Sequence, residues 1–564
     1  MVTKKVKHQS QPDGGTASDT PAMPDAPVSP RRRTNARRSG QGAAEAMVHR
    51  VEDAAKRVGQ DVKNAVEGSL GLSGERMSKV DTAWLRMDSP ANLMMIVGVW
   101  VLKPGVKYAD VCERLQEKLT QYPRFVQRVV EDAAGATWVK DQQFDIRNHV
   151  VTEQLALPKR RKKGDEQTAL QDRVAQLASE PLSRKRSLWQ FHLVEDYQGG
   201  SAMIVRIHHC IADGIALIAV TQSLVDGGAS PPQSKRKAKP VQSGAGGAGG
   251  EGFEAVQNWL QSSLLTPMTQ FAVKALDAAG EGAARSMTMM SMLADPQKSL
   301  DTGLDSAAGV ARLAFKVAQD SAALLLMPDD SPTRLKGDPG VVKKVAWCAP
   351  LPLAGVKAVC KALNCSVNDV LMSCVAGAIA QYLQDKGDAV EGKEIRAMVP
   401  VNLRPLDEAY KLGNQFGLAP VVLPIGMANP IERVYEVRRR MGELKGSMQP
   451  MMAFGLLAVA GLLIKPAQDA MLNIFSRKTT AVMTNVPGPK EKLTFCGSQI
   501  EETLAWVPQS GTVGIGVSIL SYGGGVQFGM ITDAKLCPDP QTIVNQFGPQ
   551  FAQLSAVIGK WQAA

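Results

Sequence analysis

The sequence predicts a mixed α/β protein with two folded domains, and three observations carry this prediction. The chain has 564 residues, of which 44% are hydrophobic and 21% charged, so it can fill more than one buried core. Runs typical of strands and runs typical of helices occur in both halves. Residues 227–250 are rich in Gly, Pro, Ser and Lys, a composition typical of a linker. We therefore expect one α/β sandwich over residues 76–226 and a second over 341–564.

Residues 1–75 are expected to lie outside both domains. Residues 1–40 carry eight Lys or Arg against three Asp and are rich in Pro, Ser and Gly, which predicts a disordered basic tail. Residues 41–67 have helical propensity but few apolar side chains, which predicts a marginal helix. The basic N-terminus is not followed by an apolar run, so we expect no secretory signal.

The first domain is expected to begin near Met77. Asp213 stands at the N-terminal end of its last helix, a position that acidic side chains favour. A strongly basic loop, residues 159–163 (KRRKK), could meet phosphate groups, a membrane surface or only solvent. The expected strands are at 93–102, 137–139, 188–195 and 201–208, and the expected helices at 109–119, 165–180 and 214–224.

Residues 227–340 are expected to combine the linker with amphipathic helices over 253–327, which could pack on the body or lie in a lipid interface. Residues 451–464 form the longest apolar run, but it is shorter than the roughly 20 residues of a membrane-spanning helix, so we expect a buried or interfacial helix. The second domain is expected to have helices at 351–363, 368–384, 429–445 and 541–559, and strands at 394–401, 420–424, 482–485, 494–500, 513–521 and 525–531.

The eight cysteines are scattered, without the paired spacing of a zinc site. We therefore expect reduced thiols, a cytoplasmic location and no metal. The net charge of +11 is concentrated in local clusters, which could attract nucleic acid, anionic lipid or a polyphosphate ligand. Nothing in the sequence predicts the oligomeric state.

Two adjacent histidines, His208 and His209, are the strongest candidates for chemistry. They follow a predicted strand and precede Asp213 and Gly214 in the run HHCIADG. Because side chains alternate along a strand, the two rings should point to opposite sides, so one can face a cleft while the other packs. A neutral imidazole is suited to deprotonating an alcohol, and Gly214 would let the chain turn tightly beside it. A pair of hydrogen-bonded core histidines, or half of a metal site, would have the same spacing.

The run HHCIADG fits HHxxxDG, the signature of the chloramphenicol acetyltransferase-like and condensation-domain superfamily. Further blocks resemble, in order along the chain, the bacterial wax ester synthase/acyl-CoA:diacylglycerol acyltransferase family: MSKVD at 77–81, PRF and QR within 123–128, FDIRNHV at 144–150, NDV at 368–370, NLRP at 402–405, GNQFG at 413–417 and TNVPGP at 484–489. Before the histidine strand, Ser187-Leu188-Trp189 stands where the wax ester synthase/diacylglycerol acyltransferase family usually has PLW, at a position that could shape a substrate channel.

This resemblance implies two chloramphenicol acetyltransferase-like α/β sandwich domains around a central tunnel, joined by a helical linker. It implies that His209 is the general base, supported by His208, Asp213 and Gly214. It also implies that acyl-CoA is a substrate and that no cofactor is needed.

The roles of two further sets of residues are left open by the sequence. Asn368 and Asp369 precede an apolar helix, so they could cap that helix, support the active site, or do both. Thr484, Asn485 or Ser518 could stabilise an oxyanion, and the sequence does not choose among them.

The function that the resemblance implies is an acyl-CoA-dependent O-acyltransferase that makes triacylglycerol from diacylglycerol, with wax esters from long-chain alcohols as a further product. Its partners would be acyl-CoA and the lipid acceptor, at the inner membrane face or a lipid-droplet surface, with peripheral attachment and no nucleic acid. Two alternatives stay open: a superfamily acyltransferase with another acceptor, such as an amine or a carrier-bound chain, and a non-catalytic lipid-droplet-binding protein. The intact HHxxxDG motif argues against the second.

Overall fold

The structure, a computed structural model, describes residues 74–132, 135–229, 327–404, 410–444, 449–461 and 465–563. The predicted basic tail, its marginal helix and most of the helical linker lie outside these residues, so the predictions made for them stay predictions.

The first half of the chain contributes both strands and helices. They are β1 (Gly74–Arg76), α2 (Lys79–Arg86), β2 (Met95–Lys103), α3 (Tyr108–Lys118), β3 (Gln127–Asp132), β4 (Gly135–Lys140), β5 (Val150–Glu153), α4 (Asp165–Ser179), β6 (Trp189–Tyr197), β7 (Gly200–His208) and α5 (Gly214–Leu224), with 3-10 helices at Leu119–Gln121, Pro123–Phe125 and Ile146–Asn148.

The second half contributes a similar mixture. Its elements are β8 (Lys343–Trp347), β9 (Leu351–Pro352), α10 (Leu353–Leu363), α11 (Val367–Asp385), β10 (Ile395–Asn402), β11 (Phe416–Leu423), α12 (Pro430–Leu444), α13 (Gln449–Ala460), α14 (Lys465–Ser476), β12 (Ala481–Pro487), β13 (Thr494–Phe495), β14 (Ser498–Trp506), β15 (Ile515–Tyr522), β16 (Gly525–Asp533) and α15 (Pro540–Ala563).

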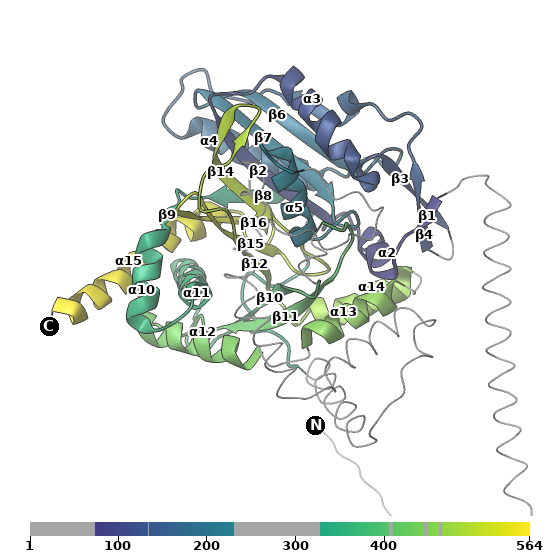
Figure 1. Cartoon of the computed structure of the whole chain (residues 1–564). Helices are drawn as coiled ribbons and strands as arrows, with labels where there is room; N and C mark the ends of the chain where they lie inside the picture. The colour runs from purple at the N-terminus through teal and green to yellow at the C-terminus, as the bar shows by residue number, and fades with distance from the viewer. Residues whose placement is uncertain are drawn as a thin grey trace, which may run out of the picture. The chain divides into compact units, whose positions relative to one another are not determined.

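Two large sheets organise these elements (Figure 1), as the α/β prediction required. One has the strand order β13-β14-β2-β7-β6-β5, and the other the order β11-β10-β12-β15-β16-β8, with β9 paired to β16. Along β2 the side chains alternate: Ile96 and Trp100 belong to one buried cluster, and Val97 and Val99 belong to another. The second of these clusters also contains Trp347 of β8, so it joins the two sheets. A separate small sheet has the order β1-β4-β3.

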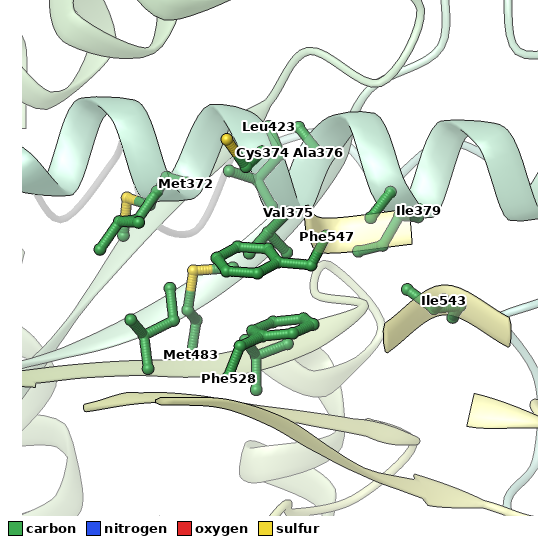
Figure 2. Packing of buried hydrophobic residues seen from close by; sticks show 14 of the residues in the cluster. Met372, Cys374, Val375, Ala376, Ile379, Leu423, Met483, Phe528, Ile543 and Phe547 are labelled. Carbon is green, nitrogen blue, oxygen red and sulfur yellow. The ribbon is translucent and has the colours of Figure 1, made fainter. Parts of the chain in front are cut away.

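The core of the second half lies between its sheet and the helices that cover it. Figure 2 shows Phe528 of β16 and Phe547 of α15 packed beneath α11. Their rings stack with centroids 4.1 Å apart. Alternate residues of β15, such as Ile515 and Val517, enter the same cluster, which is the period that a strand with one core-facing side requires.

The prediction of one strand over residues 494–500 was wrong. The chain forms a hairpin there, in which β13 and β14 are joined by Cys496 and Gly497, both at positive φ (51° and 75°). A cysteine with positive φ is uncommon, so composition gives little warning of this turn. Strand β14 then pairs with β2, so a strand from residues 341–564 completes the sheet of the first half, which the predicted division of the chain did not include.

The apolar run at 451–464 begins as helix α13, which packs on α2 and β11. The backbones come so close that a side chain on Gly417 of β11 would overlap the carbonyl oxygen of Pro450. At the other end of α13, a side chain on Gly461 would overlap the carbonyl oxygen of Lys79. Glycine therefore permits close packing at both ends. No single helix in the described residues is both long and apolar enough to cross a membrane.

Candidate active site

The two adjacent histidines lie where β7 ends and make different contacts. His208 is the last residue of β7, and the amide of His209 donates to the carbonyl oxygen of Met94 at 2.7 Å. The two rings contact different partners, Asp88 for His208 and Asn414 for His209, as strand alternation predicts.

The ring of His209 is held on three sides. Its Nδ1 lies 2.8 Å from Oδ1 of Asn414. Trp84 of α2 stacks on the ring with centroids 4.3 Å apart, and Phe416 of β11 packs at 5.3 Å with a tilt of 41°. Because an amide oxygen only accepts, Nδ1 must carry the proton, which leaves the lone pair on Nε2.

The Nε2 atom of His209 is the one left open. In the described part of the chain it makes no hydrogen bond. Neighbouring atoms also do not enclose it fully. The Nε2 atoms of His149 and His192 are enclosed in this way, and that of His208 is bonded to Asp88. Among the four described histidines, only His209 therefore has an Nε2 that is neither hydrogen-bonded nor fully enclosed.

The electrostatics of His209 favour the neutral ring. Burial lowers the pKa of His209 to about 4, although nearby Asp213 and the hydrogen bond to Asn414 act in the opposite direction. Above about pH 5 the ring is therefore uncharged, with Nε2 ready to accept a proton.

His208 has a supporting place. Its Nδ1 accepts the amide hydrogen of Cys210 at 3.1 Å, so its Nε2 carries the proton and donates to Asp88 at 3.2 Å. The pKa of Asp88 is lowered: burial alone would raise it, but His208, the amide of Met94 and the nearby charge of Arg184 together outweigh burial. This pair ties the histidine motif to the loop before β2.

Asp213 is buried and makes both a helix cap and an ion pair. Its Oδ1 accepts from the amide of Ala216 at 2.9 Å, capping α5. Its Oδ2 accepts from Arg404 at 2.8 Å and from the amide of Gln415 at 2.9 Å. The carboxylate therefore connects the histidine motif to the segment before β11.

The expected role of Gly214 in a tight turn was wrong. Gly214 is the first residue of helix α5, its φ is not positive, and a Cβ there would meet no atom within 4 Å. The position that does need glycine is Gly413, at φ +108° and closely packed against Arg124 and Asp81.

A network that sequence reasoning missed lies behind His209. Nδ2 of Asn414 donates to Oδ1 of Asp81 at 2.8 Å and to the carbonyl oxygen of His209 at 2.7 Å. Oδ2 of Asp81 accepts from Arg124 at 3.0 Å, and Arg124 also donates to the carbonyl oxygen of Ile211 at 2.9 Å. Asp81, Arg124 and Asn414 all lie in the motif blocks quoted above, but nothing in the sequence showed that they meet.

Asn368 and Asp369 occupy the start of α11 in different ways. Ser366 is the N-cap, and Asp369 completes a capping box with it. The amide of Asp369 donates to Oγ of Ser366 at 3.2 Å, and Oδ2 of Asp369 accepts from the amide of Ser366 at 2.8 Å. Asn368 instead accepts from Asn485 of β12 at 2.7 Å. Of the oxyanion candidates, Thr484 donates to the main chain of β15. The choice of oxyanion group stays open.

Comparison with known proteins identifies the family of the chain. A wax ester synthase/diacylglycerol acyltransferase catalytic-domain model matches residues 77–371, more than half of the chain, and a WS/DGAT C-terminal-domain model matches 412–555. A Mycobacterium tuberculosis relative, named a probable diacylglycerol O-acyltransferase tgs1, is 26% identical over 451 residues, covering 78% of this chain and 87% of that protein. A Mycobacterium bovis relative has the same identity and coverage and also carries a diacylglycerol O-acyltransferase name.

Solved structures share the fold. The wax ester synthase/diacylglycerol acyltransferase from Marinobacter aquaeolei VT8 aligns with a TM-score of 0.55 at 18% identity, covering 86% of this chain and all of that one. The first condensation domain of the calcium-dependent antibiotic synthetase aligns with a TM-score of 0.50 at 14% identity, covering 86% of this chain and 97% of that one. The predicted pair of chloramphenicol acetyltransferase-like α/β domains is therefore confirmed. The chain belongs to the wax ester synthase/diacylglycerol acyltransferase family.

Proposed function

We propose that this acyltransferase moves a long acyl chain from acyl-CoA to the free hydroxyl of diacylglycerol, and more slowly to long-chain alcohols. The observation that carries the proposal is the uncharged His209 with an open, unbonded Nε2. The names of the mycobacterial relatives support diacylglycerol as acceptor, and that of the Marinobacter enzyme supports a wax ester product as well. Acyl-CoA is a substrate in this proposal, and no cofactor is used.

The proposed chemistry is direct transfer. Nε2 of His209 takes the proton of the acceptor hydroxyl while its oxygen attacks the thioester carbonyl carbon. The tetrahedral adduct collapses with cleavage of the carbon–sulfur bond, and the imidazolium returns its proton to the departing thiolate. A positioned base of this kind contributes roughly 10²–10⁴-fold. Because burial disfavours the imidazolium, the proton is readily given up in the second step.

The acceptor is tested with purified protein and palmitoyl-CoA, supplied separately with dioleoylglycerol, hexadecanol and hexadecylamine. We expect release of CoA with triacylglycerol as the main product and hexadecyl palmitate as the minor one. Preferred turnover of the amine would replace the proposal with the other-acceptor alternative. Binding of diacylglycerol vesicles without turnover of any acceptor would favour the non-catalytic alternative.

We infer further that the protein works at a membrane or lipid-droplet surface, through α13. Residues 449–464 contain no charged side chain, and 451–456 are only half-buried. This helix packs on α2 and β11, which carry the ring partners of His209, Trp84 and Phe416. A lipid acceptor entering beside α13 would therefore reach the base by a short route.

The basic loop at 159–163 is exposed but lies at the far end of the sheet. Glu166, just after the loop, accepts from the amide of Gln198 at 2.7 Å, in the turn before β7. The nine residues of β7 separate that turn from His209, a span of about 27 Å. The loop is therefore not beside the base, and we assign it no part in the chemistry.

Vesicle flotation separates these two surfaces. We expect the protein to float with neutral phosphatidylcholine vesicles that contain diacylglycerol, and Leu456→Asp on α13 to weaken this because it places a charge in an apolar contact. A control variant with all five loop cations changed to glutamine should still float. Binding that requires anionic lipid and disappears in the loop variant would instead place the contact at the loop.

A further inference from the structure

Two residues outside the histidine motif form a hydrogen-bonded chain that ends at the ring of His209. They are Asp81 of α2 and Asn414, which precedes β11. We propose that Asp81 and Asn414 are positioning residues, which lock His209 in the tautomer with hydrogen on Nδ1 and so keep Nε2 available as a base. The inference rests on the proposed role of His209.

The orientation of the Asn414 amide is fixed by its acceptors. Its Nδ2 has two hydrogens, one directed to Asp81 Oδ1 at 2.8 Å and one to the carbonyl oxygen of His209 at 2.7 Å. If the amide flipped, its oxygen would face both of these acceptors, and its NH₂ group would face Nδ1. Since oxygen cannot donate, the flipped amide would lose both hydrogen bonds. The carboxylate of Asp81 therefore keeps Asn414 Oδ1 directed at the histidine.

Asp81 is itself fixed. It is 1% exposed, its Oδ1 also accepts from the amide of Asn414 at 3.0 Å, and its Oδ2 accepts from Arg124 at 3.0 Å. Arg124 continues to the carbonyl oxygen of Ile211 within the histidine motif. Four segments of the chain therefore meet behind the ring of His209, near residues 81, 124, 211 and 414.

The tautomer decides whether His209 can act. With the proton on Nδ1, Nε2 can take the proton of the substrate hydroxyl, whereas with the proton on Nε2 it could only donate a hydrogen bond to that hydroxyl. Trp84 and Phe416 restrain the ring plane but cannot distinguish the two nitrogens. The hydrogen bond from Nδ1 to Asn414 makes that distinction, together with a hydrogen bond between the ring and the main chain of His209 itself.

The test measures the tautomer directly. Protein labelled with ¹⁵N-histidine gives ring nitrogen signals that differ between the two tautomers, and His209→Gln identifies those of His209. We expect the Nδ1–H form in the wild type and a mixture of tautomers in Asp81→Asn, because the new amide lets Asn414 flip. In steady-state assays Asp81→Asn should lower kcat by at least about tenfold, with KM for palmitoyl-CoA nearly unchanged.

A second variant guards against misfolding of the first. The double variant Asp81→Asn/Asn414→Asp exchanges the two groups, so the side chains can still form a donor–acceptor pair and an acceptor still faces Nδ1. The Nδ1–H form should therefore persist, while the negative charge placed beside the ring favours the imidazolium. The acidic limb of kcat/KM, expected near pH 4 in the wild type, should then move to higher pH. The titratable and charged groups that share this environment are His208, Arg124, Asp81 and the Asp213–Arg404 pair.

The matched control is Glu153→Gln. Glu153 contacts another buried histidine, His192 on β6, at 2.8 Å. We expect this variant to leave the His209 signals and kcat unchanged. If Asp81→Asn lowers kcat but leaves the His209 signals unaltered, Asp81 has only a structural role and the proposal is overturned. If Asp81→Asn changes neither the His209 signals nor the activity, the proposal is also overturned. Because the nitrogen signals are recorded without an acyl acceptor, they test this inference even if the proposed acyl acceptor is wrong.

Discussion

Replacing His209 with glutamine is expected to lower kcat for acyl transfer from palmitoyl-CoA to diacylglycerol by roughly 10²–10⁴-fold. Glutamine fills much of the space between Trp84 and Phe416, and its amide can still donate to Asn414. It cannot take a proton at neutral pH, so the variant removes the base with little other change. Single-turnover assays with saturating palmitoyl-CoA measure the effect on the chemical step.

His208→Gln is the matched comparison, since the two histidines are adjacent and equally buried at 2% exposure. His208 is bonded through both nitrogens, so its loss should disturb the loop at Asp88 and cost far less activity. Equal losses in the two variants, or full activity of His209→Gln, would show that His209 is not the base.

Local patterns were sufficient for much of this fold. The strand before the histidines and the helix after them were predicted at 201–208 and 214–224, and β7 and α5 have these bounds within one residue. Alternation along the strand also indicated that His208 and His209 would contact different partners. Such features depend only on neighbours in the chain, so a single sequence contains them.

The rest depended on contacts between distant segments. Asn414 is 205 residues from His209, and it is 333 residues from Asp81. The resemblance marked both residues as parts of motifs, yet the motifs alone did not reveal that an amide would orient the base. The expected role of Gly214 failed for a related reason, because the positive φ that requires glycine lies at Gly413, across the contact between the two segments.

Breaking the buried pair Asp213–Arg404 is expected to have the largest effect on stability. The two side chains are 3% and 2% exposed, so Asp213→Asn leaves a buried guanidinium without its counter-ion. We expect a loss of about 3–5 kcal/mol in the free energy of unfolding, measured by urea denaturation. The exposed pair Arg439–Glu443, with 56% and 63% exposure, provides the control, and Arg439→Gln should leave the free energy of unfolding nearly unchanged.

The same pair also holds the base in place, which links stability to activity. Arg404 donates to the carbonyl oxygen of Gly413 at 2.6 Å, and Asp213 accepts from the amide of Gln415 at 2.9 Å, so the pair fixes the residues on both sides of Asn414. The double variant Asp213→Asn/Arg404→Gln removes both charges and should recover much of the stability, because no buried charge is left unpaired. Its activity should stay low, since Asn414 is no longer held. Recovery of full activity in the double variant would mean that the pair serves stability alone.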